Sequence, residues 1–102
     1  MPNLGSTNQQ TAELSQIREQ IDEINLKILN LLQQRYQLTA EVAKYKKKFN
    51  LPIIDPDREE LMFAKIQSTA ALLGLPKEEI IKIFRIILEY TYKQQEAILK
   101  HD

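Results

Sequence analysis

The chain has 102 residues, which is enough for one domain with a modest core. Fourteen basic residues balance fourteen acidic ones, and this near-zero net charge argues against a nucleic acid or a membrane surface as partner. The chain has no cysteine and one histidine, His101 at its end, so we expect no metal site. No apolar run reaches the ~20 residues of a membrane span, and the polar start lacks a signal-peptide core, so we expect a cytoplasmic protein.

Residues 1–9 are polar and are expected to form a flexible N-terminal tail. From about Gln10 to Lys48, residues that are apolar with one exception recur at steps of three and four. This is the spacing of one helix face. The residues of this stripe are Leu14, Ile17, Ile21, Ile24, Ile28, Leu31, Arg35, Leu38, Val42 and Tyr45. The sequence therefore predicts one long helix with a continuous apolar face.

The length of this helix bears on assembly. An unbroken helix from Gln10 to Lys48 extends ~58 Å, whereas a compact monomer of this size has a radius of gyration of ~13 Å. We therefore expect a homodimer in which two long helices cover each other's apolar faces. The alternative is a monomeric bundle with the helix broken near residues 33–37, although no residue there is a helix breaker.

Two shorter helices are expected after Pro52. Asp55 followed by Pro56 is a typical N-cap and first-turn pair, and the second helix is expected to run to about Leu73 with Met62, Ile66 and Leu73 facing inward. Gly74 and Pro76 mark the next break. A third helix then continues to near Lys100, with Phe84, Leu88 and Ile98 on one face. The expected fold class is all-α, with three helices per chain, one of them very long.

Several polar residues interrupt the apolar faces. Arg35 stands inside the long stripe, and burying a guanidinium without a partner is costly. Lys46 lies over nearly the same face, ~16 Å further along the helix. On the third helix Thr91 and Gln95 occupy positions that favour apolar side chains, and Glu59 stands one turn before Met62. Two fixed cations suit a small dianion such as a dicarboxylate, and catalysis in such a site would rest on positioning and electrostatics.

Each of these residues also has a structural interpretation. Arg35 could extend along the edge of the stripe towards water. Lys46 belongs to a run of lysines that suits the negative end of a helix dipole, and Glu59 suits a helix N-terminus. Thr91 and Gln95 could line a solvated groove. Their coincidence on the inward faces of all three helices favours a site.

The chain resembles the all-helical chorismate mutases of the shikimate pathway over nearly its whole length after the tail. The matching segments are IREQIDEIN with Arg18, LLQQRYQLTAEVAKYK with Arg35 and Lys46, PIIDPDREE with Asp55, Arg58 and Glu59, and IFRIILEYTYKQQ with Thr91 and Gln95. The resemblance implies an intertwined homodimer and an isomerase that converts chorismate to prephenate, towards phenylalanine and tyrosine, without a cofactor. It assigns residues 10–102 to the chorismate mutase domain.

The resemblance also implies roles for individual residues. Arg18 and Arg35 would hold the substrate carboxylates, and Lys46 and Gln95 would donate hydrogen bonds to the ether oxygen. Because Arg18 is ~25 Å along the helix and ~100° around it from Arg35, the resemblance takes Arg18 from the other subunit. The remaining residues would be substrate contacts: Asp55 and Glu59 at the ring hydroxyl, Thr91 at a carboxylate in place of the common serine, and Val42 and Leu88 as apolar walls.

Two other functions compete with chorismate mutase. An isochorismate-pyruvate lyase would use a similar cationic pocket on the same scaffold, but Glu59 in the DPDREE turn favours the mutase. A non-catalytic helical dimerisation module would predict that Arg35, Lys46 and Gln95 can be replaced without loss of function.

Overall fold

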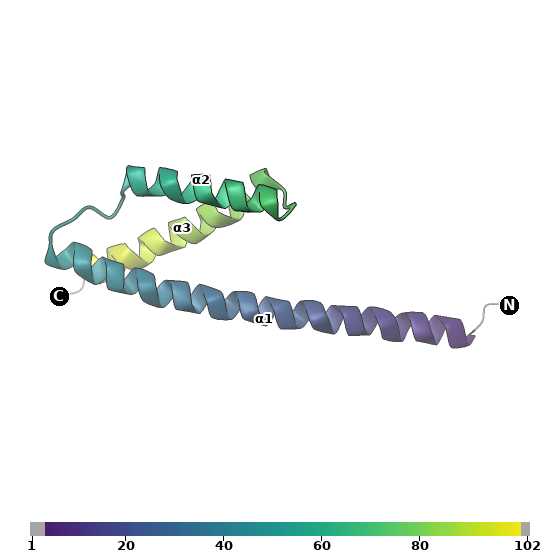
Figure 1. Cartoon of the computed structure of the whole chain (residues 1–102). Helices are drawn as coiled ribbons and strands as arrows, with labels where there is room; N and C mark the ends of the chain where they lie inside the picture. Colours follow the sequence, from purple (N-terminus) through teal and green to yellow (C-terminus); the bar gives the residue numbers. More distant parts are fainter. Residues whose placement is uncertain (1–3, 101–102) are drawn as a thin grey trace. The chain divides into compact units, whose positions relative to one another are not determined.

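The computed structural model describes residues 4–100, with side chains from residue 8 onwards. These residues form three helices, α1 (Leu4–Lys48), α2 (Pro56–Leu72) and α3 (Lys77–Lys100) (Figure 1). The predicted all-α class is confirmed. The helix α1 begins six residues earlier than expected: Gly5, Ser6, Thr7 and Asn8 are weak helix formers, but none of them is a proline that would exclude helix. Residues 1–3 of the expected tail and His101 lie outside the described residues.

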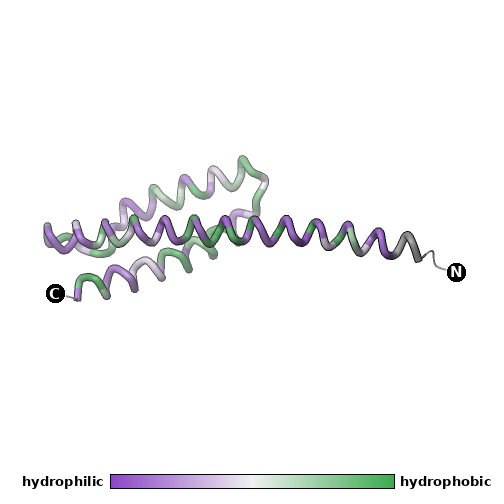
Figure 2. Tube along the Cα trace, turned by 90° about the horizontal axis from the view of Figure 1, so that it is seen from below, coloured by the Kyte–Doolittle hydropathy of each residue, from purple (hydrophilic) through white to green (hydrophobic). Residues whose placement is uncertain are grey.

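The chain divides into two units, residues 1–35 and residues 36–102. Within the described range, the first unit is the N-terminal part of α1 alone. Its stripe residues are between 46% and 62% exposed, and they are Leu14, Ile17, Ile21, Ile24, Ile28 and Leu31. Figure 2 shows hydrophobic residues recurring among hydrophilic ones along this helix. A contiguous apolar face of this kind marks an interaction surface in a folded protein.

The helix α1 continues through residues 33–37 without a break, so the alternative of a broken helix is wrong. It ends in a Schellman motif at Asn50, whose φ is 54°. The amide of Leu51 donates to the carbonyl of Lys46 at 2.8 Å, and that of Asn50 to Lys47 at 3.4 Å. This ending turns the chain at Asn50, about one helical turn after Lys46.

The boundaries of α2 follow the predicted signals. The Asp55 carboxylate accepts a hydrogen bond from the Arg58 amide at 3.1 Å, which confirms Asp55 as the N-cap. Gly74, with φ 69°, ends the helix in a second Schellman motif, in which the Leu75 amide donates to the Ala70 carbonyl at 2.8 Å.

The second unit contains the last turns of α1 together with α2 and α3, and α2 packs against α3. Among its described residues, the buried apolar ones are small, Ala43 and Ala70. The other buried residues described are polar and all belong to α3: Thr91, Gln94 and Gln95. Met62 and Ile66 are half-buried as expected, whereas Leu73 is 67% exposed. The most protected part of this unit is therefore a polar contact between α3 and the end of α1.

Candidate active site

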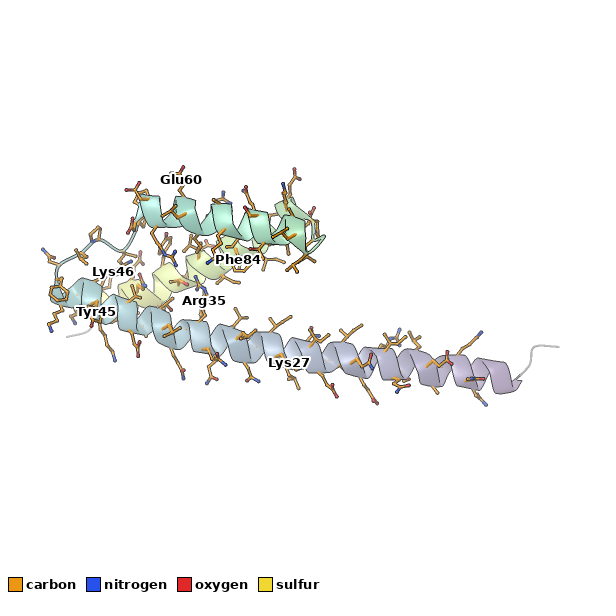
Figure 3. The ribbon with its side chains drawn as sticks, viewed as in Figure 1. Lys27, Arg35, Tyr45, Lys46, Glu60 and Phe84 are labelled. Atoms are coloured by element: carbon orange, nitrogen blue, oxygen red, sulfur yellow. The ribbon has the colours of Figure 1, made fainter. Side chains whose placement is uncertain are left out.

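Lys46 lies in the last turn of α1 and is half-buried (Figure 3). Its ammonium group donates to the backbone carbonyl of Ile53, in the connection between α1 and α2, and to Oε1 of Gln95 at 3.1 Å. An ammonium group has three N–H bonds, so these two contacts leave one for a further acceptor. Burial lowers the pKa of Lys46, and the Asp55 carboxylate opposes this shift because it favours the charged form.

Gln95 is the partner of Lys46 on α3 and is 3% exposed. While its Oε1 accepts from Lys46, its Nε2 donates to the backbone carbonyl of Thr39 at 3.2 Å. The reverse orientation of the amide would place two oxygens together at Thr39 and two donors together at Lys46. Its orientation is therefore fixed by both neighbours, and one N–H of the amide is available to a ligand.

Gln94, next to Gln95, makes a second pair of contacts with α1. Its Nε2 donates to the Tyr36 carbonyl at 2.8 Å, and its Oε1 accepts from the Thr39 hydroxyl at 2.6 Å. The centroid of the Tyr36 ring also lies 5.3 Å from the centroid of the Tyr90 ring on α3. Two adjacent glutamines thus bind two successive turns of α1.

The other predicted residues of α1 and α3 are placed as follows. Thr91 is buried, and its hydroxyl donates to the Ile87 carbonyl one turn earlier at 3.0 Å. Leu88 is half-buried and Val42 is 46% exposed. A back-bonded hydroxyl of this kind still has oxygen lone pairs, and it can turn to donate to an anion instead.

The residues predicted at the start of α2 follow Ile53, the backbone partner of Lys46, within a few positions of the sequence. Asp55 is exposed and caps α2, and Glu59 is half-buried one turn later. The Lys46 contact with Ile53 holds this connection at the end of α1. The same side chain therefore links the connection that precedes α2 to Gln95 on α3.

Arg18 and Arg35 both belong to α1, in residues 1–35. Arg18 is exposed, and Arg35 is half-buried and already engaged in an interaction. The structure of one chain brings Lys46 and Gln95 into contact, and the clamp expected of these two arginines stays a prediction.

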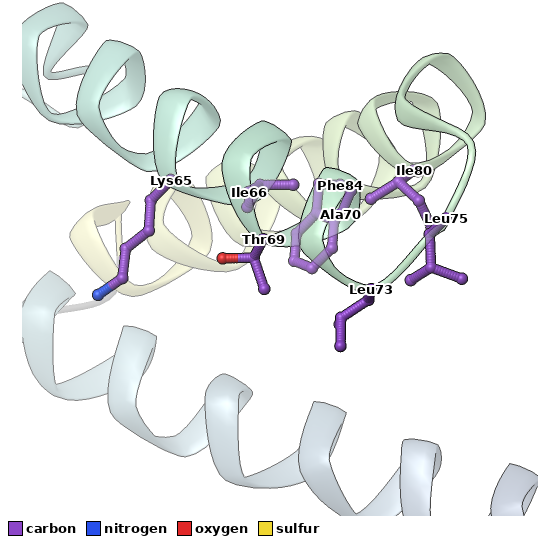
Figure 4. A pocket seen from close by; sticks show the side chains of 8 residues that line it. All are labelled: Lys65, Ile66, Thr69, Ala70, Leu73, Leu75, Ile80 and Phe84. Atoms are coloured by element: carbon purple, nitrogen blue, oxygen red, sulfur yellow. The ribbon is translucent and has the colours of Figure 1, made fainter.

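An apolar groove lies between α2 and α3, away from these polar contacts (Figure 4). Its lining residues are Lys65, Ile66, Thr69, Ala70, Leu73, Leu75, Ile80 and Phe84. Leu73 and Leu75 are 67% and 45% exposed, so the groove is open in the single chain. The expected inward position of Leu73 is wrong for the single chain because nothing in the described residues fills the groove.

Sequence reasoning missed Gln94, Thr39 and the carbonyl of Ile53. Spacing could have found two of them, since Gln94 stands three residues after Thr91 and Thr39 stands seven before Lys46, on the same helix faces. The Ile53 carbonyl is a backbone group, so its side-chain type gives no signal.

The chemistry of this arrangement is that of a donor pair. An ammonium group and an amide, held on two helices, each have one further N–H that a ligand oxygen could accept. Among the described residues, no group of three or more His, Cys, Asp or Glu is placed to hold a metal ion, and no helix has the length and apolarity to cross a membrane. The fold and site define an all-helical domain suited to a small oxygen-rich ligand.

Comparison with known proteins identifies the family. Residues 17–96 match the family model of chorismate mutase type II. The chain is 35% identical to the chorismate mutase of Methanocaldococcus jannaschii over 88 residues, 86% of this chain and 89% of that protein. It is 37% identical to the T-protein of Enterobacter agglomerans over 84 residues, 82% of this chain but 22% of that protein. It is also 38% identical to a bifunctional chorismate mutase/prephenate dehydratase of Aquifex aeolicus, of which it covers 25%.

The chain belongs to the type II chorismate mutase family. This confirms the resemblance identified in the sequence and the predicted function, a chorismate mutase that acts as an isomerase in aromatic amino acid biosynthesis. The chain spans about a quarter or less of two of these relatives and most of the third.

Proposed function

We propose that this chain by itself converts chorismate to prephenate, in a site whose reacting centre lies against Lys46 and Gln95. The observation that carries the proposal is the contact between these two side chains, 3.1 Å apart on α1 and α3, with one donor left on each. Such a pair can hold one ligand oxygen from two sides.

The rearrangement gives this pair a clear task. As the C–O bond of the ether breaks and the new C–C bond forms, negative charge grows on the ether oxygen. Donors that are fixed beforehand stabilise that charge without reorganisation, and one such donor typically contributes ~3 kcal/mol, about a hundredfold in rate. The burial of Gln95 and the half-burial of Lys46 strengthen this effect because they reduce contact with water.

We further propose roles for the residues around the donor pair. Arg35 and a second arginine, Arg18, hold the two carboxylates of the substrate. The remaining contacts come from residues of α1, α2 and α3: the carboxyl groups of Asp55 and Glu59 bind the ring hydroxyl, Thr91 binds a carboxylate, and Val42 and Leu88 pack against the ring. The half-burial of Arg35, Glu59 and Leu88 supports these assignments, since side chains that are partly protected still have a face for a ligand.

The proposed assembly is an intertwined homodimer in which Arg18 comes from the second copy. Arg18 and Arg35 are ~25 Å apart along one helix, too far for one small ligand to bridge. The exposed stripe of α1 and the open groove between α2 and α3 both offer apolar surface that a second copy of this chain would bury. Residues 10–102 form the catalytic domain in this proposal, and the family match over 17–96 supports it.

The test is an assay of the purified chain with chorismate and, separately, with isochorismate. The proposal expects conversion of chorismate to prephenate. Lys46→Ala should lose most of this activity, whereas Lys82→Ala, which changes an exposed lysine of α3, should keep it. Release of pyruvate from isochorismate without prephenate formation would instead identify a lyase. A folded chain inactive on both substrates would support a non-catalytic dimerisation module.

A further inference from the structure

We infer that Gln94 and Thr39 are positioning residues, which hold α3 against α1 in the one register at which Gln95 meets Lys46. This inference rests on the proposed function of the Lys46–Gln95 pair and extends it to two residues with no assigned role. Neither side chain contacts the Lys46 ammonium in the structure, and both act through Gln95.

The first support is the geometry of the two glutamines. Gln94 and Gln95 are consecutive, and they donate to the carbonyls of Tyr36 and Thr39, three residues apart on α1, at 2.8 and 3.2 Å. Two hydrogen bonds to two different turns fix both the position of α3 along α1 and its rotation relative to this part of α1. A single bond at Gln95 would allow α3 to slide or turn about that point.

The second support is the Thr39 hydroxyl. It donates to Oε1 of Gln94 at 2.6 Å and also lies 3.0 Å from the Tyr36 carbonyl; that carbonyl can only accept, so it fixes Nε2 as the end of the Gln94 amide that faces it. The backbone carbonyl of the same Thr39 accepts from Gln95. One residue of α1 therefore bonds both amides, its side chain contacting Gln94 and its backbone Gln95.

The third support is burial. Gln94 and Gln95 are 7% and 3% exposed, and a buried amide without partners is unfavourable. Every oxygen and nitrogen of the Gln94 amide has a partner in the structure. A buried polar network with all its members paired specifies one arrangement, whereas apolar residues at these positions would tolerate several.

The experiment compares Thr39→Val, Thr39→Ser and Gln94→Met with the parent chain. Thr39→Val exchanges the hydroxyl for a methyl group, Thr39→Ser keeps the hydroxyl and loses the methyl group, and Gln94→Met has a similar length but makes neither hydrogen bond. Gln67→Met, at an exposed position of α2, is the matched control. For each variant, kcat and KM for chorismate are measured per folded site, with circular dichroism and thermal unfolding giving the folded fraction.

We expect kcat to fall about tenfold in Gln94→Met and about threefold to tenfold in Thr39→Val, with KM changed less than twofold. Thr39→Ser should recover most of kcat, and Gln67→Met should match the parent. Equal kcat per folded site in Thr39→Val and Thr39→Ser would overturn the inference, even if both were less stable. Should Gln94→Met fail to fold, the Thr39 pair still decides, since Thr39→Ser keeps the hydroxyl and Thr39→Val exchanges it for a methyl group.

Failure of this inference differs from failure of the proposed function. A parent chain that does not convert chorismate removes the function before any variant is compared. A parent that converts chorismate while all three variants keep its kcat retains the function and removes the positioning role.

Discussion

Gln95→Glu changes one atom of the donor pair and should make activity strongly dependent on pH. The substitution replaces the Nε2 group, which donates to the Thr39 carbonyl at 3.2 Å, with an oxygen. An ionised carboxylate at this position would face that carbonyl and would repel the charge that develops on the ether oxygen. When protonated, the carboxyl group has one O–H, which can donate to the ether oxygen in place of the amide N–H.

Two opposing effects act on the pKa of the introduced carboxyl group. Burial at a position that is 3% exposed raises it, and the Lys46 ammonium, which lies 3.1 Å from the present Oε1, lowers it. Above this pKa the variant lacks one preorganised donor, so kcat should be lower by about a hundredfold, or ~3 kcal/mol. As the pH falls through this pKa, kcat should rise towards that of the parent.

The measurement is kcat against pH for the parent, Gln95→Glu and Gln67→Glu, which makes the same change at an exposed position of α2. The parent should be nearly flat from mildly acidic to mildly alkaline pH, since Gln95 does not titrate, and Gln67→Glu should follow it. A flat profile for Gln95→Glu would show that Gln95 does not face the ether oxygen, and the assigned role would be wrong.

Other predictions concern the charge of Lys46, the cap of α2 and assembly. Because burial lowers the pKa of Lys46 and the ammonium form is required, kcat of the parent should fall at a lower pH than the one at which an exposed lysine loses its proton. Asp55→Asn removes the charge that opposes this lowering of the Lys46 pKa. The pH at which the variant loses half of its own kcat should therefore be lower still. An unchanged pH of half-loss would argue against an interaction between Asp55 and Lys46. Asp55→Ala should in addition lower the free energy of unfolding by ~1 kcal/mol through loss of the N-cap, whereas Asp55→Asn should keep the cap, as chemical denaturation can show. Sedimentation at micromolar concentration should give twice the 11.9 kDa mass of one chain, and an active monomer would contradict the dimer.

The helix boundaries were largely predictable because local signals determine them. Asp55 with Pro56 begins α2, and Gly74 ends it, in the structure as in the sequence. The end of α1 was also predicted correctly, although the Schellman motif there uses Asn50 rather than glycine. The beginning of α1 was not, since a helix start without a strong cap or breaker has no sharp signal.

The candidate site was predictable only in part. The break in apolar spacing identified Lys46 and Gln95, and the structure places them in contact. The same reasoning passed over Gln94 because a periodic pattern selects one residue of an adjacent pair. It could not find the Ile53 carbonyl, which depends on how the connection after α1 folds back. The roles of Arg18 and Arg35 remain predictions, because they concern a ligand and a second copy of the chain.

The most direct test of a site shared between two copies is to mix two inactive variants. Arg18→Ala and Arg35→Ala should each lose most activity while keeping the helical signal. If Arg18 acts across the interface, each mixed dimer has one site with both arginines intact, and full subunit exchange should restore about a quarter of the parent activity. If labelled subunits demonstrably exchange and activity stays at the level of the separate variants, the two arginines do not meet across a dimer and the shared site is contradicted.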